Sequence, residues 1–567
     1  MTKRRFWTGF AAFAFTAIAA AAIWWSLQHP FGTSWDESQY LNEAQIDAQR
    51  LQHGMLLRLG GRILIMSVGR PPAYRILALP VLGLTGFHTA IVRLVTLACF
   101  ALSSLLVFWA TRRIANSSGG GFAVLIFCLS PIVIAAGRWF STEGPLYLAV
   151  AATMYCIFEI WFSGVNGKRL WIGLGLAVGL GFLAKASYIA ILLPVLVIWL
   201  IAERRLNLHI PKLVSQWKAG LLACLIAGPW WILNIKPALS YTEYARGFVA
   251  NSLGPPSFLT RVWWLGTVFQ SLLGYGVSIV IAIVLIVALR QVMLTKKLRL
   301  TPRQKLALSA CASAAIPIVL VQLTGTNQLL RHITPAMIPF AIAIGALAEW
   351  TGWAQESMST AITAVLLSGQ LAIVVVPVFF PNHREVSVGL PNGQYPWRVM
   401  ALLDQWDWTP LWQIGRDCDV PSPKISYLGF GSAFDKEQLE RPWIAAAGKT
   451  GLATIQYADL TWLWHYEEGP IQWQKVMTSA DSSDFVVTAP GYKPLGDDDS
   501  HLDNQYNSEF AERLSRDPNF REPIRLEMGR FKPIPVLIFA RKSLNCKFRS
   551  DNMSLSTLPQ FLSHRGH

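Results

Sequence analysis

Charge is scarce in this sequence. Of its 567 residues only 14% are Asp, Glu, Lys or Arg, whereas 53% are hydrophobic and the mean hydropathy is +0.38. So few charged side chains cannot give a large globular chain a polar surface, which excludes an ordinary soluble protein. The composition therefore predicts a polytopic membrane protein.

Several functional motifs are absent as well. The sequence has no internal repeat, low-complexity tract or nucleic-acid-binding motif, and its region after residue 381 has no phosphate-binding glycine pattern. The net charge of +16 does not indicate nucleic acid, because Lys and Arg lie mainly in short loops between apolar runs. Only seven cysteines occur, and none has metal-ligand spacing. Five are predicted to be small packing residues, but Cys418 and Cys546 lie in a polar region and could form a disulfide outside the cytoplasm.

The apolar runs predict about eleven membrane-spanning helices between residues 1 and 380. The first, at 6–27, follows a basic N-terminus as in a secretory signal, but its length and its closing tryptophans predict an uncleaved helix. The other runs lie at about 88–111, 121–137, 145–162, 170–184, 187–202, 217–235, 265–289, 306–325, 333–350 and 358–380. From 381 to 567, short β-like runs alternate with helix-like stretches, which predicts a soluble α/β domain.

The distribution of basic residues predicts the orientation in the membrane. If the N-terminus is cytoplasmic, the basic clusters at 112–113, 168–169, 204–212 and 296–305 all lie in cytoplasmic loops, as orientation rules require. We therefore expect a bacterial inner-membrane protein whose C-terminal domain faces the periplasm. The same alternation places a set of charged residues on the periplasmic side, namely Asp36, Arg70, Arg138, Glu143, Lys185 and Arg331.

An acidic pair, Asp36 and Glu37, lies in the external loop 29–75 directly after the first span. Acids suit a membrane boundary poorly, because aromatic and basic side chains are favoured there. Ser34 and Glu37 also fit a capping box, so the pair is either a helix cap or a chemical site. The residues that follow predict an amphipathic helix on the membrane surface, and then a short helix at 73–84 after paired prolines.

Four further charged residues lie on the same predicted side. Arg138 and Glu143 share a tight loop, Lys185 stands where two apolar runs meet, and Arg331 opens the tenth span. Each basic residue alone can be an interfacial anchor or a snorkelling side chain. Together they would suit a membrane-embedded cavity that holds an anionic phosphate beside a carboxylate base.

These motifs resemble the polyprenyl-phosphate-sugar-dependent glycosyltransferases of the GT-C fold, in the branch of protein O-mannosyltransferases and lipid A aminoarabinose transferases. The resemblance covers the membrane half and rests on Trp35-Asp36-Glu37, Arg70-Pro71-Pro72-Ala73-Tyr74, Arg138 to Glu143, Gly181 to Lys185, Pro229-Trp230-Trp231 and Arg331 to Pro335. That family often has His or Lys before its paired prolines and glycine after its lysine. Here Arg70 and Ala186 stand instead, which leaves the donor's sugar open.

The resemblance implies an inverting glycosyltransferase that moves a sugar from a polyprenyl-phosphate donor to a hydroxyl of a lipid, glycan or protein. It implies Asp36 as general base, with Glu37 as a neighbour that orients it. Fixed cations could neutralise the leaving phosphate, so no metal is required, although a divalent ion held by Asp36 and Glu143 is an alternative. The implied phosphate ligands are Arg70, Arg138, Lys185 and Arg331, and the further site candidates are Tyr40, Tyr74, Glu143 and His332.

Two other classes of function compete with transfer. A transporter or flippase of lipid-linked sugars would use the same cationic rim without breaking a bond, but should show inverted repeats and broken helices near the midplane. The sequence indicates neither feature. In a structural membrane protein the convergence of charges would be accidental.

Overall fold

The computed structural model describes residues 3–28, 35–65, 70–163, 167–205, 210–253, 257, 259, 261, 266, 272–294, 298–324, 330–379, 406–420, 422–428, 436–446, 456–460, 471–492, 506–528 and 534–547. Two compact units make up the chain. The helical unit comprises Met1–Pro30 and Asp47–Arg398, and the sheet unit comprises Phe31–Ile46 and Val399–His567. The domain boundary expected at residue 381 lies outside the described residues.

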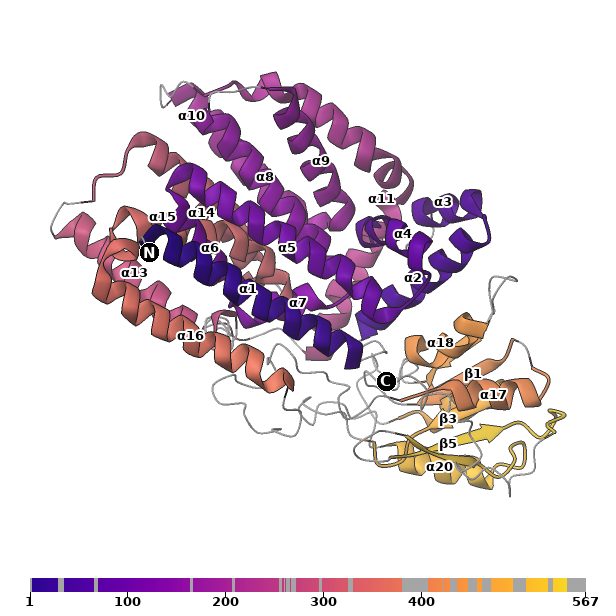
Figure 1. Cartoon of the computed structure of the whole chain (residues 1–567). Coiled ribbons are helices and arrows are strands. Elements are labelled where there is room, and N and C mark those ends of the chain that lie inside the picture. Colours follow the sequence, from indigo (N-terminus) through magenta and orange to yellow (C-terminus); the bar gives the residue numbers. More distant parts are fainter. Residues whose placement is uncertain are drawn as a thin grey trace. The chain divides into compact units, whose positions relative to one another are not determined.

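Long apolar helices build the helical unit (Figure 1). Among the described residues, nine helices are long and apolar enough to cross a membrane, and a bent pair could form a tenth span. Their outer faces carry exposed apolar side chains such as Leu225 and Ile232, as lipid contact requires. The chain is an integral membrane protein. The helices are α1 (Lys3–Gln28), α5 (Thr89–Ile114), α6 (Ser117–Cys128), α7 (Pro131–Arg138), α8 (Glu143–Ser163), α9 (Lys168–Ala184), α10 (Ile189–Arg205), α11 (Trp217–Leu253), α13 (Tyr275–Met293), α14 (Pro302–Thr324), α15 (Met337–Trp350) and α16 (Ser357–Phe379).

The apolar runs predicted from the sequence fall on these helices, apart from the first part of the run at 265–289, which is only partly described. The run at 121–137 is not one straight helix. It divides into α6 and α7, which are bent by 71° at a break before Pro131. Because proline has no N–H to donate, it begins a new helix here instead of continuing the old one. This broken helix was not expected from the sequence.

Three shorter helices follow α1: α2 (Trp35–Gln52), α3 (Leu56–Ile65) and α4 (Ala73–Thr85). The short helix predicted at 73–84 is confirmed as α4. The surface helix predicted before it is α2, but α2 is largely buried, with Glu37 1% and Asp47 0% exposed. Its polar face is therefore covered by protein. A polar group such as the Asp47 carboxylate can be buried because it has a partner within the fold. The amphipathic exposure belongs to α3, where Leu57 is 94% exposed.

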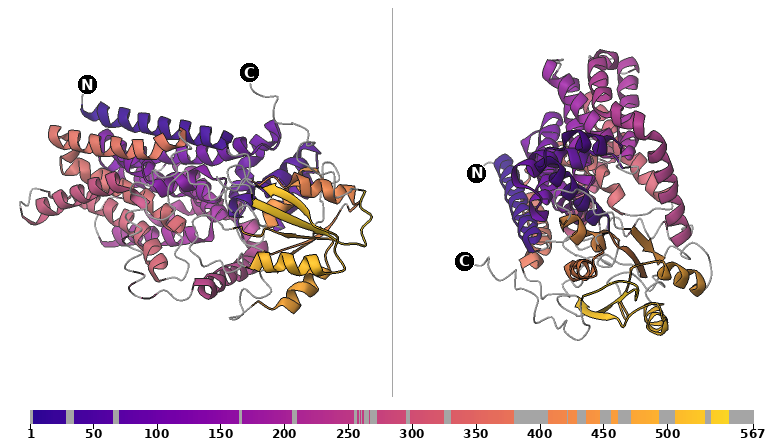
Figure 2. Two further views of the ribbon diagram at one scale, coloured as in Figure 1. Left: turned by 90° about the horizontal axis from the view of Figure 1, so that it is seen from below. Right: turned by 90° about the vertical axis from the view of Figure 1, so that its right-hand side faces the viewer.

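The sheet unit contains five strands in the order β2-β1-β3-β5-β4 (Figures 1 and 2). The first three are parallel to one another, and β5 runs antiparallel to both β3 and β4. An α/β domain in this region is therefore confirmed. The strands are β1 (Lys424–Leu428), β2 (Gln456–Asp459), β3 (Phe485–Thr488), β4 (Ile524–Met528) and β5 (Ile534–Ala540), and the helices are α17 (Thr409–Asp417), α18 (Lys436–Ala446), α19 (Trp473–Asp481) and α20 (Asn507–Arg516).

Helices cover both faces of this sheet. Phe485 and Val487 of β3 enter one apolar core with α17 and α18, whereas Val486 enters a second core with α19 and α20. Alternate side chains of a strand point to opposite faces, so a strand buried on both sides is apolar throughout. Cys418, at the end of α17, forms a disulfide with Cys546, as the sequence allowed.

Candidate functional site

The acidic pair lies in the first turn of α2, in the sheet unit. Asp36 and Glu37 are the second and third residues of this helix. The Glu37 side chain is buried, and Tyr40 follows one turn later, 6% exposed. The Asp36 side chain and Ser34 lie outside the described part of the chain, so a capping box stays an alternative to a chemical site here.

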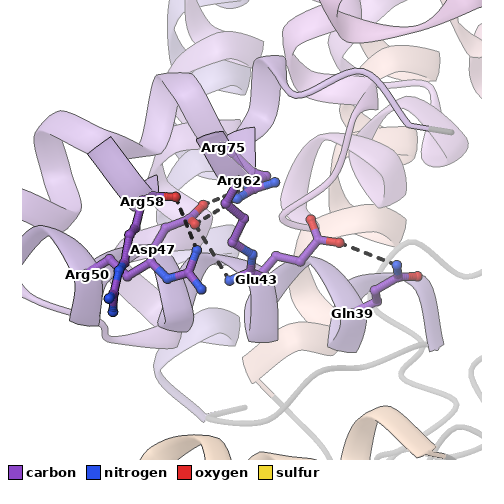
Figure 3. A network of polar contacts seen from close by, with 7 residues as sticks. All are labelled: Gln39, Glu43, Asp47, Arg50, Arg58, Arg62 and Arg75. Carbon is purple, nitrogen blue, oxygen red and sulfur yellow. Dashed lines mark hydrogen bonds and ion pairs between the residues drawn. The ribbon is translucent and has the colours of Figure 1, made fainter. Parts of the chain in front are cut away.

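A buried ion pair fixes the other end of α2 within the helical unit (Figure 3). Arg75 of α4 donates to both carboxylate oxygens of Asp47, from Nε and Nη2, at 2.7 Å each. Arg62 of α3 approaches the same carboxylate at 3.8 Å, and burial lowers the pKa of the adjacent Arg50. The bidentate contact sets the position of α4, whose first turn follows Arg70. Sequence reasoning missed this pair because nothing in a spacing of 28 residues indicates it.

Glu143 and Lys185, both predicted site residues, form an ion pair. Lys185 Nζ donates to Glu143 Oε1 at 3.0 Å. Glu143 begins α8 and is 5% exposed, while Lys185 directly follows α9 and keeps 26% of its side chain exposed. Of the two alternatives for this lysine, snorkelling or pairing with an anion, pairing is found. The side chain is partly exposed and its ammonium carries three donors, so it can also contact a second anion.

Arg138, at the end of α7, lies over an aromatic ring. Its guanidinium carbon is 3.9 Å from the centre of the Trp25 ring, and the side chain is 2% exposed. Arg93 of α5 approaches the same ring at 4.8 Å and is 1% exposed. Two guanidinium groups thus share one indole, a cation–π arrangement that stabilises buried positive charge. Sequence reasoning missed Arg93, although an arginine inside an apolar span is itself a signal.

The remaining candidates of the helical unit lie on neighbouring elements. Tyr74 of α4 is buried and contacts Phe140, with ring centres 5.6 Å apart. Arg70 and His332 are half-buried, and the Arg331 side chain is not among those described. Arg331 and His332 belong to a 3-10 helix, η3 (Leu330–Ala336), which packs against α7 and α8.

The helical unit therefore brings its predicted residues onto elements that contact one another. Helix α4 packs on α8 and α9, and α8 packs on α7, α9 and η3. The acidic pair and Tyr40 belong to the sheet unit instead. In the part of the chain that is described, no three His, Cys, Asp or Glu side chains form a group able to hold a metal ion.

Comparisons with known proteins place this geometry in context. Residues 69–233 match the model of the dolichyl-phosphate-mannose-protein mannosyltransferase family. The chain is 29% identical over 188 residues to an undecaprenyl phosphate-alpha-4-amino-4-deoxy-L-arabinose arabinosyl transferase of Pseudomonas fluorescens, a match that covers 30% of each protein. It also superposes on crystal structures of ArnT from Cupriavidus metallidurans, over 94% of this chain and 98% of that one. The TM-score is 0.53 for the apo state and 0.52 for the state bound to undecaprenyl phosphate, with 14% and 15% identity.

The chain has the GT-C fold. This confirms the resemblance seen in the sequence and the predicted fold class. The family match includes Arg70, Arg138, Glu143 and Lys185, but it begins after the acidic pair and ends before η3. The chain spans about 30% of the length of the curated relative it matches. The GT-C likeness in sequence is thus concentrated in the helical unit, where the cations lie.

Proposed function

We propose that this chain is an inverting glycosyltransferase that moves a sugar from a polyprenyl-phosphate donor to an acceptor hydroxyl. One observation carries the proposal: in a chain of GT-C fold, the buried Arg138 ends α7 and an ion pair joins Glu143 at the start of α8 to Lys185 directly after α9, and α8 packs against both α7 and α9. Similarity to a transferase named for an undecaprenyl-phosphate-linked sugar supports the donor class. The bend between α6 and α7 is a break of the kind that a transporter would also need, but the curated relatives that the chain resembles are named as transferases.

The donor phosphate binds the cations of the helical unit, Arg70, Arg138, Lys185 and Arg331. Stacking on Trp25 occupies the face of the Arg138 guanidinium, whereas its N–H groups lie in the plane of the group, where phosphate oxygens are bound. Glu143 holds Lys185 in place before the donor arrives. Tyr74 and His332 lie on elements that pack against α8, and in this proposal they also contact the donor.

The proposed reaction follows from the resemblance, which assigns the base to Asp36 and the phosphate contacts to the cations of the helical unit. The Asp36 carboxylate accepts the proton of the acceptor hydroxyl, whose oxygen forms a bond to the anomeric carbon. The bond from that carbon to the phosphate oxygen breaks, and its electron pair stays on the phosphate, so the configuration inverts. Arginine and lysine stabilise the charge that develops on the leaving polyprenyl phosphate. Glu37 and Tyr40 flank the base on α2. The fixed cations supply the neutralisation that a metal would otherwise provide, so the proposed reaction requires none.

The sheet unit and the acidic pair face the periplasm in this proposal, and the N-terminus is cytoplasmic. The disulfide between Cys418 and Cys546 supports this orientation, because structural disulfides persist in oxidising compartments. The acceptor is a hydroxyl of an envelope lipid, a glycan or an exported protein.

Mass spectrometry of the cell envelope tests the proposed function. Deleting the gene should remove one sugar mass from a specific lipid, glycan or protein, and a plasmid copy should restore it. The released lipid should be a polyprenyl phosphate, not a diphosphate. A flippase would give a different result. In the deletion cells the unreacted lipid-linked sugar would accumulate on the cytoplasmic face, and supplying the donor outside would leave every acceptor modified.

A further inference from the structure

Two polar contacts, one buried and one partly buried, join α2 to α18 within the sheet unit. Gln438 Nε2 donates to Ser38 Oγ at 2.6 Å, and Asn42 Nδ2 donates to Glu440 Oε1 at 3.0 Å. Ser38 and Asn42 are each 3% exposed, and Gln438 is 5% exposed. The partners are 400 and 398 residues apart in the sequence. These contacts therefore tie the helix that carries the acidic pair to the C-terminal α/β fold.

The two contacts fix more than the distance between the helices. Ser38 and Asn42 are four residues apart and so lie on one face of α2, one above the other. Apolar packing through Leu41 and Ala44 is non-directional and would tolerate rotation or sliding of the helix. Hydrogen bonds between buried side chains are directional, and leaving either partner unsatisfied is unfavourable. The pair of contacts therefore sets both the rotation and the axial position of the first turns of α2.

Helix α18 is itself held rigidly. Leu439 is fully buried and Trp443 is 3% exposed, and both pack into the apolar core on one face of the sheet. Gln438 and Glu440 flank Leu439 in the sequence, so their positions follow from that core. At the other end of α2, the contact of Asp47 with Arg75 holds the helix in the helical unit. Side chains supported in this way can position a neighbouring group to the accuracy that catalysis demands.

We infer that Gln438 and Glu440 are positioning residues for the acidic pair. Ser38 directly follows Glu37 and lies two residues after Asp36, so an orientation imposed at Ser38 is imposed on the helix turn that carries the base. The inference rests on the proposed function. It assigns the sheet unit a part in the transfer step: the unit holds the base in one orientation towards the acceptor hydroxyl. A small misplacement of a catalytic group lowers turnover without loosening substrate binding elsewhere.

A charge-swap experiment tests this inference in the full-length protein. Asn42→Asp places a carboxylate against Glu440, and we expect transfer to fall by about tenfold to a hundredfold. Adding Glu440→Gln reverses donor and acceptor, because the new amide donates to the new carboxylate, and should restore transfer to within about threefold. Transfer is measured as the glycosylated envelope product in deletion cells that carry each variant at equal protein level. Binding of undecaprenyl phosphate to each purified variant should stay unchanged.

Thr488→Val is the matched control. Thr488 makes a buried hydrogen bond to Asn507 of α20 in the same unit, so its loss lowers stability without touching the contacts of α2. Product should stay at the wild-type level at equal protein amount. If Asn42→Asp does not accumulate, Asn42→Ala removes the same hydrogen bond without repulsion and should lower transfer several-fold.

The outcomes separate the two proposals. Wild-type transfer by the Asn42 variants, or a loss that the double variant does not recover, overturns the positioning role. An equal loss in Thr488→Val also overturns it, because the effect would then be one of stability. If Asp36→Asn abolishes transfer while the Asn42 variants do not, only the positioning role fails. If Asp36→Asn transfers sugar normally, Asp36 is not the general base and the proposed function fails at that step.

Discussion

At the scale of single residues, buried charges are held in three ways in the helical unit. Asp47 is paired by Arg75 in a bidentate contact, Glu143 by Lys185, and Arg138 is stacked on Trp25. Burying a charge without such a partner would be strongly unfavourable, so each arrangement is also a requirement of the fold. The Lys185 side chain is also partly exposed, so it remains able to contact a ligand.

Removing only the arginine of the Asp47–Arg75 pair should lower the stability of the protein. Arg75→Ala leaves a fully buried carboxylate without its main partner, and we expect a loss of about 3–5 kcal/mol in the free energy of unfolding. Thermal unfolding of the detergent-solubilised protein measures it. Arg516→Ala, which breaks an exposed pair with Glu512, should cost less than about 1 kcal/mol. Equal effects of the two substitutions would mean that Asp47 is solvated, contrary to its burial.

Lys185 should contact the donor phosphate in addition to its ion-pair partner, Glu143. Lys185→Met should weaken binding of undecaprenyl phosphate by about tenfold to a hundredfold, the range expected for a lost charge-assisted contact. Glu143→Gln frees the ammonium from its ion pair and should leave binding equal or tighter. Binding measured by ligand-dependent thermal shift separates the cases. If neither substitution changes the affinity, Lys185 serves only as the partner of Glu143.

The sequence allowed single site residues to be predicted, but not the contacts between pairs of residues. The sequence pointed to Arg138, Glu143 and Lys185 because these acidic and basic residues converge on one predicted side of the membrane, although each basic residue alone could be an anchor. It could not indicate that Arg75 pairs with Asp47, because such contacts join segments whose proximity depends on tertiary packing. Assignments at Asp36 and Arg331 stay predictions, since their side chains lie outside the described residues.

At the scale of elements, the apolar runs and the short helix α4 could be read from the sequence because length and hydropathy determine them. The bend between α6 and α7 was not predicted, although Pro131 marks the place where the backbone hydrogen bonds stop. Helix α2 was expected on the membrane surface but is largely buried. In a sequence, polar residues at helical spacing give the same pattern whether they face water or buried partners. The order of the strands depends on pairings between distant segments, which the sequence does not encode locally.

The disulfide should stabilise the sheet unit. It joins the end of α17 to the segment after β5 across 128 residues, so it restricts the unfolded chain strongly. We expect Cys418→Ser to lower the stability of this unit by about 2–5 kcal/mol, the range for losing a native disulfide. Thermal unfolding with and without a reducing agent measures it. The reducing agent should destabilise the wild type and leave the variant unchanged, and a wild type indifferent to reduction would contradict the bond.

At the scale of the whole molecule, one chain combines an apolar helical unit with a mixed sheet, and α2 contributes residues to both. Its first residues, with the acidic pair, belong to the sheet unit, and those from Asp47 onwards belong to the helical unit. Sequence composition predicted two parts of this kind, because hydropathy changes near the end of α16. It gave no sign that residues 31–46 would join the C-terminal fold, which is a property of packing.

The orientation of the chain is testable with fusions. A reporter active only outside the cytoplasm should give signal when fused after Arg416, and none when fused in the loop near Lys168. The reason is the one-sided distribution of basic residues in short loops. Both fusions must be expressed at equal levels for the comparison. A silent fusion after Arg416 with full-length protein in the membrane would contradict the orientation.

The most direct test of the proposed transfer is the turnover of Asp36→Asn. The amide keeps the shape of the carboxylate but cannot take the proton, so sugar transfer from a polyprenyl-phosphate donor should fall by about 10²–10⁴-fold. Glu37→Gln is the matched variant, because a capping role at Glu37 survives this change. Both variants should keep the expression and melting temperature of the wild type and should bind undecaprenyl phosphate normally. Near-normal transfer by Asp36→Asn would show that the acidic pair is a helix cap and not the catalytic base.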